Sequence, residues 1–176
     1  MIGRETQICL VNKLENIHHV VVQASAIDGS NVFALQLLHK QSDVVVYQTP
    51  NDSETVTFDE DHPILYLKGP NSAGTAGGHT QTWIQSGENS KWFVGTKPKR
   101  HGNTYWTTQI ARVTVLGYQT QVFTNNTELP RLSYLNRAGA GYGDGSTVYP
   151  GKDLVRVEAT VSPNGHYFLI ASIDIN

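Results

Sequence analysis

The residues best suited to hold a ligand lie in the segment "GGHTQTW", Gly77 to Trp83. If this segment is a strand, the period of two places His79, Gln81 and Trp83 on one face. An imidazole, an amide and an indole side by side offer stacking area together with hydrogen-bonding groups, the combination that sugar rings require. The alternative is structural, because Trp83 can pair with Trp92 across neighbouring strands in the core. The segment therefore predicts either a ligand-facing edge or a core contact.

A second group of candidates lies in "PRLSYLNRAG", residues 130–139. In a strand, Arg131 and Arg137 share one face, and Tyr134 lies on the other. The two arginines either pair with carboxylates such as Glu128 or Glu158, or coordinate an anionic ligand. Arg131, Tyr134 and Arg137 join the candidate ligand-binding residues.

Signatures of metal or nucleophilic chemistry are missing from the sequence. There is no HExxH pattern, no G-x-S-x-G elbow and no pair of cysteines, since Cys9 is the single cysteine. Two carboxylates on a predicted hairpin, Glu158 and Asp174, could approach the separation that a glycosidase needs, but neither belongs to a catalytic motif. We expect no metal site, no cofactor and no catalytic residue.

The composition narrows the choice of partner. Charged residues make up 16% of the chain, against about 25% in typical soluble domains, and the net charge is −2. The surface must then be rich in neutral polar groups, which is typical of exported β-rich binding proteins. Basic residues are scattered, so nucleic acid is not an expected partner. No apolar run approaches the ~20 residues of a membrane helix, and the N-terminus does not resemble a signal peptide.

Short segments rich in Val, Ile, Thr, Tyr and Phe recur between turn signals, a pattern that predicts strands. The segment "NVFALQLLHK" could also start a helix, but its β-branched neighbours favour a strand. A "PNG" turn joins the last two segments as a hairpin. The predicted strands cover residues 18–25, 31–38, 43–49, 63–69, 79–86, 91–97, 107–116, 131–137, 154–162 and 166–175.

These elements predict a single all-β domain over residues 1–176, built as an antiparallel meander. Regular strand spacing is compatible with a sandwich, a barrel or a propeller. The segment "VEATVSPNGHYFLIASID" favours propeller-like blades, with a β-sandwich as the alternative. A closed propeller needs at least about four blades of four strands, so about ten strands would form an incomplete one.

Five blocks in one order resemble the N-terminal half of the helveticin J family, large heat-labile bacteriocins of lactobacilli. The blocks are "GGHTQTW", "WFVGTKP", "QIARV", "PRLSYLNRAG" and "VEATVSPNGHYFLIAS". The resemblance implies a propeller-like antimicrobial protein that acts on related bacteria and is secreted or attached to the cell surface. It supplies no catalytic residue.

Three functions compete at this point. The first is a bacteriocin-like protein that recognises a glycan or teichoic polymer of the target envelope. The second is a cell-wall hydrolase, and the third is a non-killing, lectin-like or surface-layer-associated module. Family members are longer than this chain, and an unfinished propeller would expose strand edges, so we also expect a homodimer formed through those edges.

Overall fold

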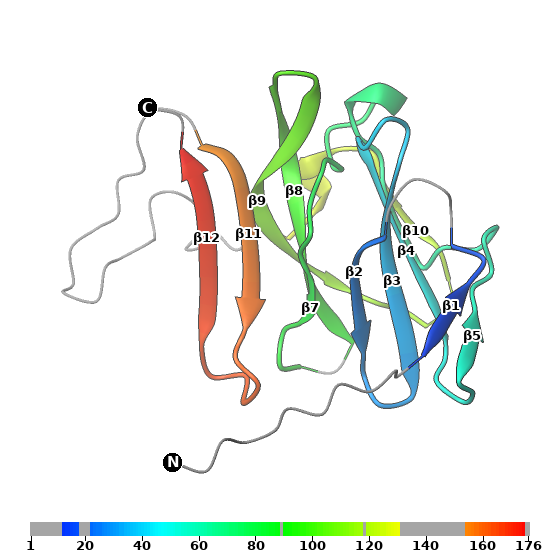
Figure 1. Ribbon diagram of the computed structural model, residues 1–176. Coiled ribbons are helices and arrows are strands. Elements are labelled where there is room, and N and C mark those ends of the chain that lie inside the picture. Colours follow the sequence, from blue (N-terminus) through cyan, green and yellow to red (C-terminus); the bar gives the residue numbers. More distant parts are fainter. Residues whose placement is uncertain (1–11, 18–21, 89, 118, 131–153, 175–176) are drawn as a thin grey trace, which may run out of the picture.

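A computed structural model describes residues 12–17, 22–88, 90–117, 119–130 and 154–174. Strands dominate these ranges, and the helical elements within them are two 3-10 turns, η1 (Pro70–Ser72) and η2 (Asn126–Glu128) (Figure 1). The all-β prediction is confirmed. The strands are β1 (Lys13–Glu15), β2 (Val22–Ile27), β3 (Asn31–Leu38), β4 (Asp43–Pro50), β5 (Thr55–Thr57), β6 (Leu65–Leu67), β7 (Trp83–Gln85), β8 (Lys91–His101), β9 (Thr104–Thr114), β10 (Gln121–Phe123), β11 (Leu154–Val161) and β12 (Phe168–Asp174).

The described strands form four sheets. The largest has the order β10-β6-β4-β3-β2, the next is β7-β8-β9, and the pairs β1-β5 and β11-β12 complete the set. Neighbours along the chain pair antiparallel, as the meander prediction requires. The pairs β1-β5 and β10-β6 are parallel instead. Of these short strands, β6 falls within the predicted strand 63–69, whereas β1, β5 and β10 were not predicted, because so short a segment carries no readable alternation.

The sheets pack face to face in layers, which Figure 1 shows side by side. The main core lies between the five-stranded and the three-stranded sheet. Its centre is aromatic: Trp92 stacks on Trp83 with ring centroids 4.8 Å apart, and Phe33 lies 4.5 Å from Trp92. Aliphatic side chains of β3, β4, β6, β8 and β9 surround these rings, so one continuous apolar layer joins the two sheets.

Smaller apolar clusters lie on the outer faces of these two sheets. Val45 and Tyr47 of β4 pack with Val56 and Phe58, next to the β1-β5 pair. On the opposite side of the molecule, β11 and β12 cover the three-stranded sheet. Val157 of β11 is buried in this outer cluster, whereas Ala159, Val161, Phe168 and Ile170 are only partly buried against it, so the apolar contact of the last layer is thinner than the main core.

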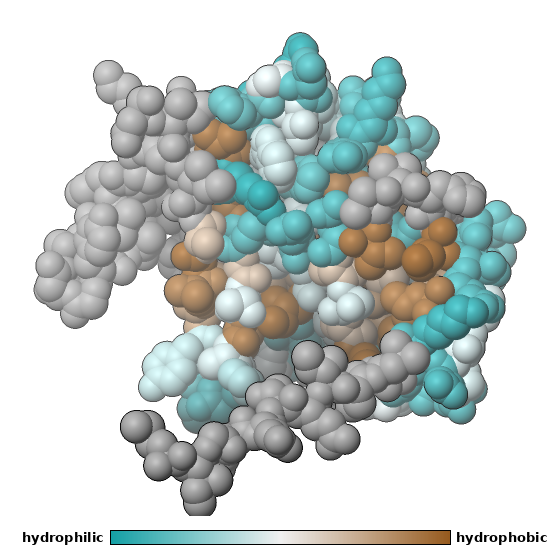
Figure 2. Space-filling view, in the orientation of Figure 1, coloured by the Kyte–Doolittle hydropathy of each residue, from teal (hydrophilic) through white to brown (hydrophobic). Residues whose placement is uncertain are grey.

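The surface over the β8–β9 hairpin differs from that over the last layer of the stack. Figure 2 shows hydrophilic side chains over the β8–β9 hairpin and apolar ones over β11 and β12. Tyr167 and Leu169, beside or within β12, are 72% and 66% exposed. Among the described strands β12 pairs with β11 alone. A homodimer through that edge stays a prediction.

Most strand predictions agree with the structure to within a few residues. The segment 31–38 is a strand and not a helix, and "PNG" joins β11 to β12. One prediction was wrong: residues 79–82 do not belong to a strand, and β7 covers Trp83–Gln85 only. Predicted strand 131–137 lies outside the described residues. Within the described ranges, no helix has the length and hydropathy needed to cross a membrane.

Candidate functional site

The segment that precedes β7 runs beside the start of β9 through an isolated bridge. The backbone N–H of His79 donates to the carbonyl of Tyr105 at 2.6 Å, and the N–H of Thr107 donates to the carbonyl of His79 at 3.1 Å. This local pairing replaces the predicted strand. The side chains of residues 79–82 are therefore directed by contacts with other elements and not by strand alternation.

Trp83 does not share a surface with His79 and Gln81. Its side chain is 3% exposed and stacks on Trp92 with the ring planes 2° apart. Trp92 pairs with Gln85 in the β7–β8 register, so the two indoles meet diagonally across the strands. The core contact considered for Trp83 and Trp92 is confirmed, and it removes Trp83 from the candidate ligand-facing edge.

His79 is also largely buried, at 9% exposure. Its ring stacks on Trp106 of β9 with centroids 4.1 Å apart, and its Nε2 lies 3.2 Å from Oε1 of Gln23. Burial, together with the positive charge of Arg156, lowers the pKa of His79, against a smaller opposing effect of Glu158. The imidazole is therefore neutral near pH 7, and its role is to support Trp106.

Glu158 of β11 holds the whole segment in place. One carboxylate oxygen, Oε2, accepts hydrogen bonds from the Thr82 hydroxyl at 2.7 Å, the Gln81 backbone at 2.9 Å and the Thr80 hydroxyl at 3.2 Å. The Thr82 hydroxyl also accepts from the backbone N–H of Ala159 at 2.9 Å. Two of the sequence blocks, "GGHTQTW" and the one that begins with Val157, thus meet in space at one carboxylate.

Arg156 completes this arrangement, which we call the junction cluster: His79, Gln81, Trp106, Arg156 and Glu158. The Arg156 Nε donates to Oε1 of Glu158 at 2.9 Å, and its Nη2 donates to Oε1 of Gln81 at 2.7 Å. The guanidinium lies 4.5 Å from the centroid of the Trp106 ring, which is a cation–π contact. Both side chains of the ion pair are about one-fifth exposed, so the cluster is partly open to solvent.

The polar groups of the junction cluster that have no hydrogen-bond partner within the described residues are hydrogen-bond donors. Within the described part of the chain, the hydrogen bonds of this cluster use Oε1 of Gln81 and Nε and Nη2 of Arg156. Nε2 of Gln81 and Nη1 of Arg156 remain available, beside a half-buried indole. Because Glu158 balances the charge of Arg156, this surface suits an uncharged or weakly anionic ligand with oxygen acceptors.

Sequence reasoning foresaw part of this cluster. It selected His79 and Gln81, but missed Trp106, Arg156 and Gln23. Arg156 and Glu158 stand two apart in a predicted strand and so share a face, a signal that could have identified the pair. Nothing local connects them to Gln81, 75 residues earlier. Arg131, Tyr134 and Arg137 lie outside the described residues.

The β11–β12 register keeps Glu158 and Asp174, the pair considered for hydrolysis, apart along the hairpin. Asp174 pairs with Leu154 in the β11–β12 register, whereas Glu158 pairs with Ala171. Three residues separate Ala171 from Asp174, or about 10 Å along a strand, on top of the spacing between strands. Across the described ranges, no group of three or more His, Cys, Asp or Glu side chains is placed to hold a metal ion.

A second polar cluster surrounds Asp43, whose carboxylate is fully buried. Its oxygens accept from the Ser72 hydroxyl at 2.5 Å, the Tyr66 hydroxyl at 2.7 Å and the Gly69 backbone at 2.9 Å, and His39 Nδ1 lies 2.7 Å away. Burial opposes ionisation, yet these hydrogen bonds together hold the pKa of Asp43 below its usual value.

The Asp43 cluster fixes a strained turn. Residues 39, 40 and 41 all have left-handed backbone angles, with φ of 48°, 58° and 63°, a conformation that costs energy for each non-glycine residue. The carboxylate ties this turn, which joins β3 to β4, to the turn at η1. Its hydrogen bonds are satisfied within the protein, which indicates a structural role.

Together, the fold and the junction define an all-β protein of packed sheets with a polar, partly exposed contact between two of them. The chain belongs to the family of bacteriocin helveticin-J, whose family model matches residues 3–176. It is 35% identical over 170 residues to bacteriocin helveticin-J of Lactobacillus helveticus, and the match covers 90% of this chain and 45% of that protein. The chain thus spans about half the length of this relative. No solved structure matches significantly.

Proposed function

We propose that this chain is the envelope-recognition part of a bacteriocin-type protein that acts on related bacteria. The observation that carries the proposal is the family match over residues 3–176, supported by 35% identity to a protein that carries the name bacteriocin. Family membership also supports secretion, or attachment to the cell surface, since a bacteriocin must reach other cells. The partner is a glycan or teichoic polymer of the target envelope.

The proposed contact surface is the open side of the junction cluster. Gln81 is exposed and presents its Nε2, and Arg156 presents Nη1 above the Trp106 ring. Amide and guanidinium donors next to an aromatic ring suit hydroxyl and acetamido oxygens of a sugar chain. His79 supports Trp106 from within. Arg131, Tyr134 and Arg137 are proposed as further contacts to the same polymer.

The layered sheets are proposed to be successive blades of a propeller-like fold. The consecutive antiparallel meanders β2-β3-β4-β6 and β7-β8-β9 support this, because they pack face to face through one apolar layer. The β11–β12 hairpin adds the next layer. A crystal structure of a full-length family member with its sheets arranged around one axis would establish the blades, and two sheets closed into a sandwich would refute them.

Binding and growth inhibition on intact cells test the function. Fluorescently labelled protein is incubated with Lactobacillus helveticus, and bound label and growth are measured for the wild type and for Gln81→Ala. Gln119→Ala is the matched control, because Gln119 is also exposed and lies away from the junction cluster. We expect binding by the wild type and the control, with a loss of about two- to tenfold for Gln81→Ala, the range of one neutral hydrogen bond.

Other outcomes select the competing functions. Binding without growth inhibition would favour the non-killing surface module. Clearing of purified peptidoglycan in a zymogram would favour the hydrolase. The absence of both binding and inhibition on a panel of lactobacilli would refute envelope recognition.

A further inference from the structure

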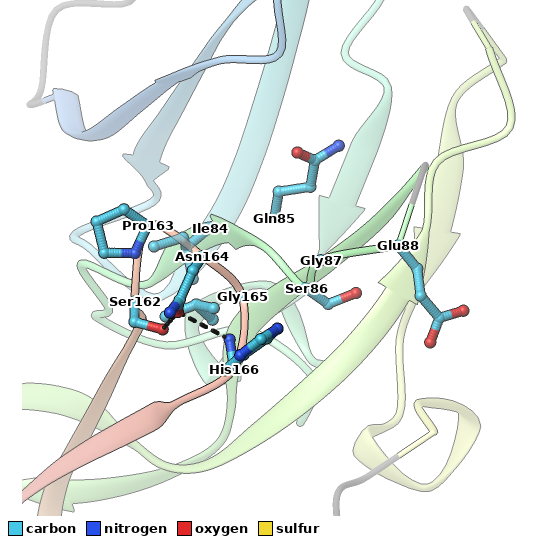
Figure 3. A pocket seen from close by; sticks show the side chains of 11 residues that line it. Ile84, Gln85, Ser86, Gly87, Glu88, Ser162, Pro163, Asn164, Gly165 and His166 are labelled. Carbon is cyan, nitrogen blue, oxygen red and sulfur yellow. Dashed lines mark hydrogen bonds between the residues drawn. The ribbon is translucent and has the colours of Figure 1, made fainter.

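A cleft of about 630 Å³ opens between two hairpin turns, one between β7 and β8 and the other between β11 and β12. Figure 3 shows Gln85, Ser86 and Glu88 on one wall, and Ser162, Asn164 and His166 on the other. The volume falls within the range of about 300–1,000 Å³ that is usual for ligand sites. The cleft lies outside the junction cluster and involves none of its residues.

The wall of the cleft formed by the turn between β11 and β12 is held in shape before any ligand arrives. In the second turn, Oδ1 of Asn164 accepts from the Ser162 hydroxyl at 2.6 Å and from the His166 backbone at 3.2 Å (Figure 3). The Ser162 hydroxyl accepts in turn from the backbone N–H of Tyr167 at 2.9 Å. A preorganised wall lowers the entropy that binding must overcome.

Glycine lets the two turns approach each other. Gly87 and Gly165 have φ of 82° and 71°, which other residues adopt only with strain. A Cβ built on Gly87 would stand 3.9 Å from the backbone of Gly165, so the turns touch through bare main chain. The lining side chains therefore stand around this contact and leave the space beside it open.

The lining offers polar groups over an apolar floor. Ile84 and Val161 belong to the outer apolar cluster that joins β11 to the three-stranded sheet. The Ser86 hydroxyl has no hydrogen-bond partner among the described residues, and a rotation about χ1 would expose its buried oxygen to a ligand in the cleft. The exposed His166 ring and the amide of Gln85 complete a neutral set of donors and acceptors.

The one charged group in the lining is already neutralised. The Glu88 carboxylate accepts a hydrogen bond from Lys91 and lies 3.3 Å from Nη1 of Arg112. A ligand therefore meets no unpaired charge in the lining. Hydroxyl and amide groups above an aliphatic surface match the two faces of a sugar ring, one bearing hydroxyls and the other C–H groups.

From this geometry we infer that the cleft between the two turns binds a neutral saccharide. The inference rests on the proposed envelope recognition and names a second contact for it. The residues that bind are Ser86 and His166, with Ile84 and Val161 beneath the ring.

The cleft and the junction cluster lie along one line. Gln81 bonds to Glu158, Thr82 bonds to Ala159, and Ile84 packs in the same cluster as Val161, so residues 81–84 follow β11 in the same direction. Ser162 directly follows β11 and stands four positions after Glu158, which is about 13 Å along an extended chain. A short oligosaccharide spans that length, so affinity should rise with chain length until both contacts are filled.

The test uses two fractions released from walls of Lactobacillus helveticus, the neutral polysaccharide and the teichoic acid. Binding of each to the wild-type chain is measured by saturation-transfer NMR and calorimetry, and then repeated with Ser86→Ala and His166→Ala. We expect binding of the neutral fraction, weakened about two- to tenfold by each substitution, as for one lost hydrogen bond. His101→Ala is the control, because His101 is an exposed histidine at the end of β8.

Three results would contradict a saccharide site in the cleft. Failure of the neutral fraction to bind, binding of teichoic acid alone, or unchanged affinity in both variants would overturn the inference. Circular dichroism confirms that each variant is folded, which both side chains permit because neither makes a described hydrogen bond of its own. Cell binding that persists while both variants behave as wild type would refute the cleft but leave the proposed function. Saccharide binding without cell binding would refute the proposed envelope recognition but leave the cleft as a saccharide site.

Discussion

Two carboxylates tie distant segments together in this protein, and they do so in different surroundings. Asp43 is fully buried, at the end of a sheet that the main aromatic core supports on one face. Glu158 is one-fifth exposed and joins β11 to residues 80–82, where the apolar contact is thin. Asp43 has its acceptor sites filled by short hydrogen bonds, whereas the cluster around Glu158 leaves donors of Gln81 and Arg156 open.

The region around Asp43 is therefore structural, whereas the region around Glu158 is suited to binding. Where apolar burial is large, a buried carboxylate fixes one turn and has its hydrogen bonds satisfied within the protein. Where apolar burial is small, polar contacts must hold the sheets together, and such contacts leave exposed groups at the surface. Both the junction cluster and the cleft lie on this weaker boundary.

The largest expected loss of stability comes from a substitution in the main aromatic core. Trp92→Ala removes the ring that contacts both Trp83 and Phe33, and should destabilise the protein by about 3–5 kcal/mol. Chemical denaturation followed by circular dichroism measures this. Phe168→Ala, in the outer cluster, should cost less, because its side chain is only partly buried. Equal losses would contradict the assignment of the main core.

The next effect concerns Asp43. Asp43→Ala leaves the donors of Ser72, Tyr66 and Gly69 unpaired and should cost about 3 kcal/mol. Because the folded-state pKa is lowered, the stabilisation is fully present above the unfolded value of about 3.9 and is lost as pH falls through the folded value. Denaturation at several pH values below 5 measures it. Asp52→Ala, at an exposed site, should leave the acid response unchanged.

The sequence predicted the strands of the structural region well, for a physical reason. Residues 32–35 and 44–47 are continuous apolar runs, and the burial of both faces of β3 and β4 requires that pattern. The same reasoning failed at residues 79–82. Their alternation resembles a strand, but the Thr80 and Thr82 hydroxyls and the Gln81 backbone N–H bond to a carboxylate more than 75 residues away, which no local pattern reveals.

The candidate site was foreseen only in part. His79 and Gln81 were selected for their chemistry, and they do meet Arg156 and Trp106. Trp83 was placed beside them by a period of two that the backbone does not follow. The cleft was not foreseen, because two turns far apart in the chain form it and neither carries a motif.

A moderate loss of stability is expected from a substitution in the junction cluster. Glu158→Ala removes the acceptor of three hydrogen bonds and leaves the half-buried Arg156 without its partner. We expect a loss of about 1–3 kcal/mol. Hydrogen exchange should rise in residues 79–85 and in β11, while β3 and β4 stay protected. A uniform rise across all the sheets would show that the two regions unfold as one unit.

The smallest expected effect is a pH dependence of stability that differs between the junction cluster and the Asp43 cluster. Burial and the charge of Arg156 lower the pKa of His79, so the unfolded chain takes up a proton below about pH 6.5 that the folded chain refuses. Stability then falls with decreasing pH by up to about 1.4 kcal/mol per unit, until the folded pKa is reached. His79→Gln should abolish this slope just below pH 6.5, and His101→Gln should keep it. The loss of stability should appear first in hydrogen exchange of residues 79–85 and β11, whereas the region around Asp43 weakens only below about pH 4. If the stability of His79→Gln still falls with decreasing pH in this range, another group causes the acid sensitivity. The junction cluster and the Asp43 cluster would then not differ in their response to pH.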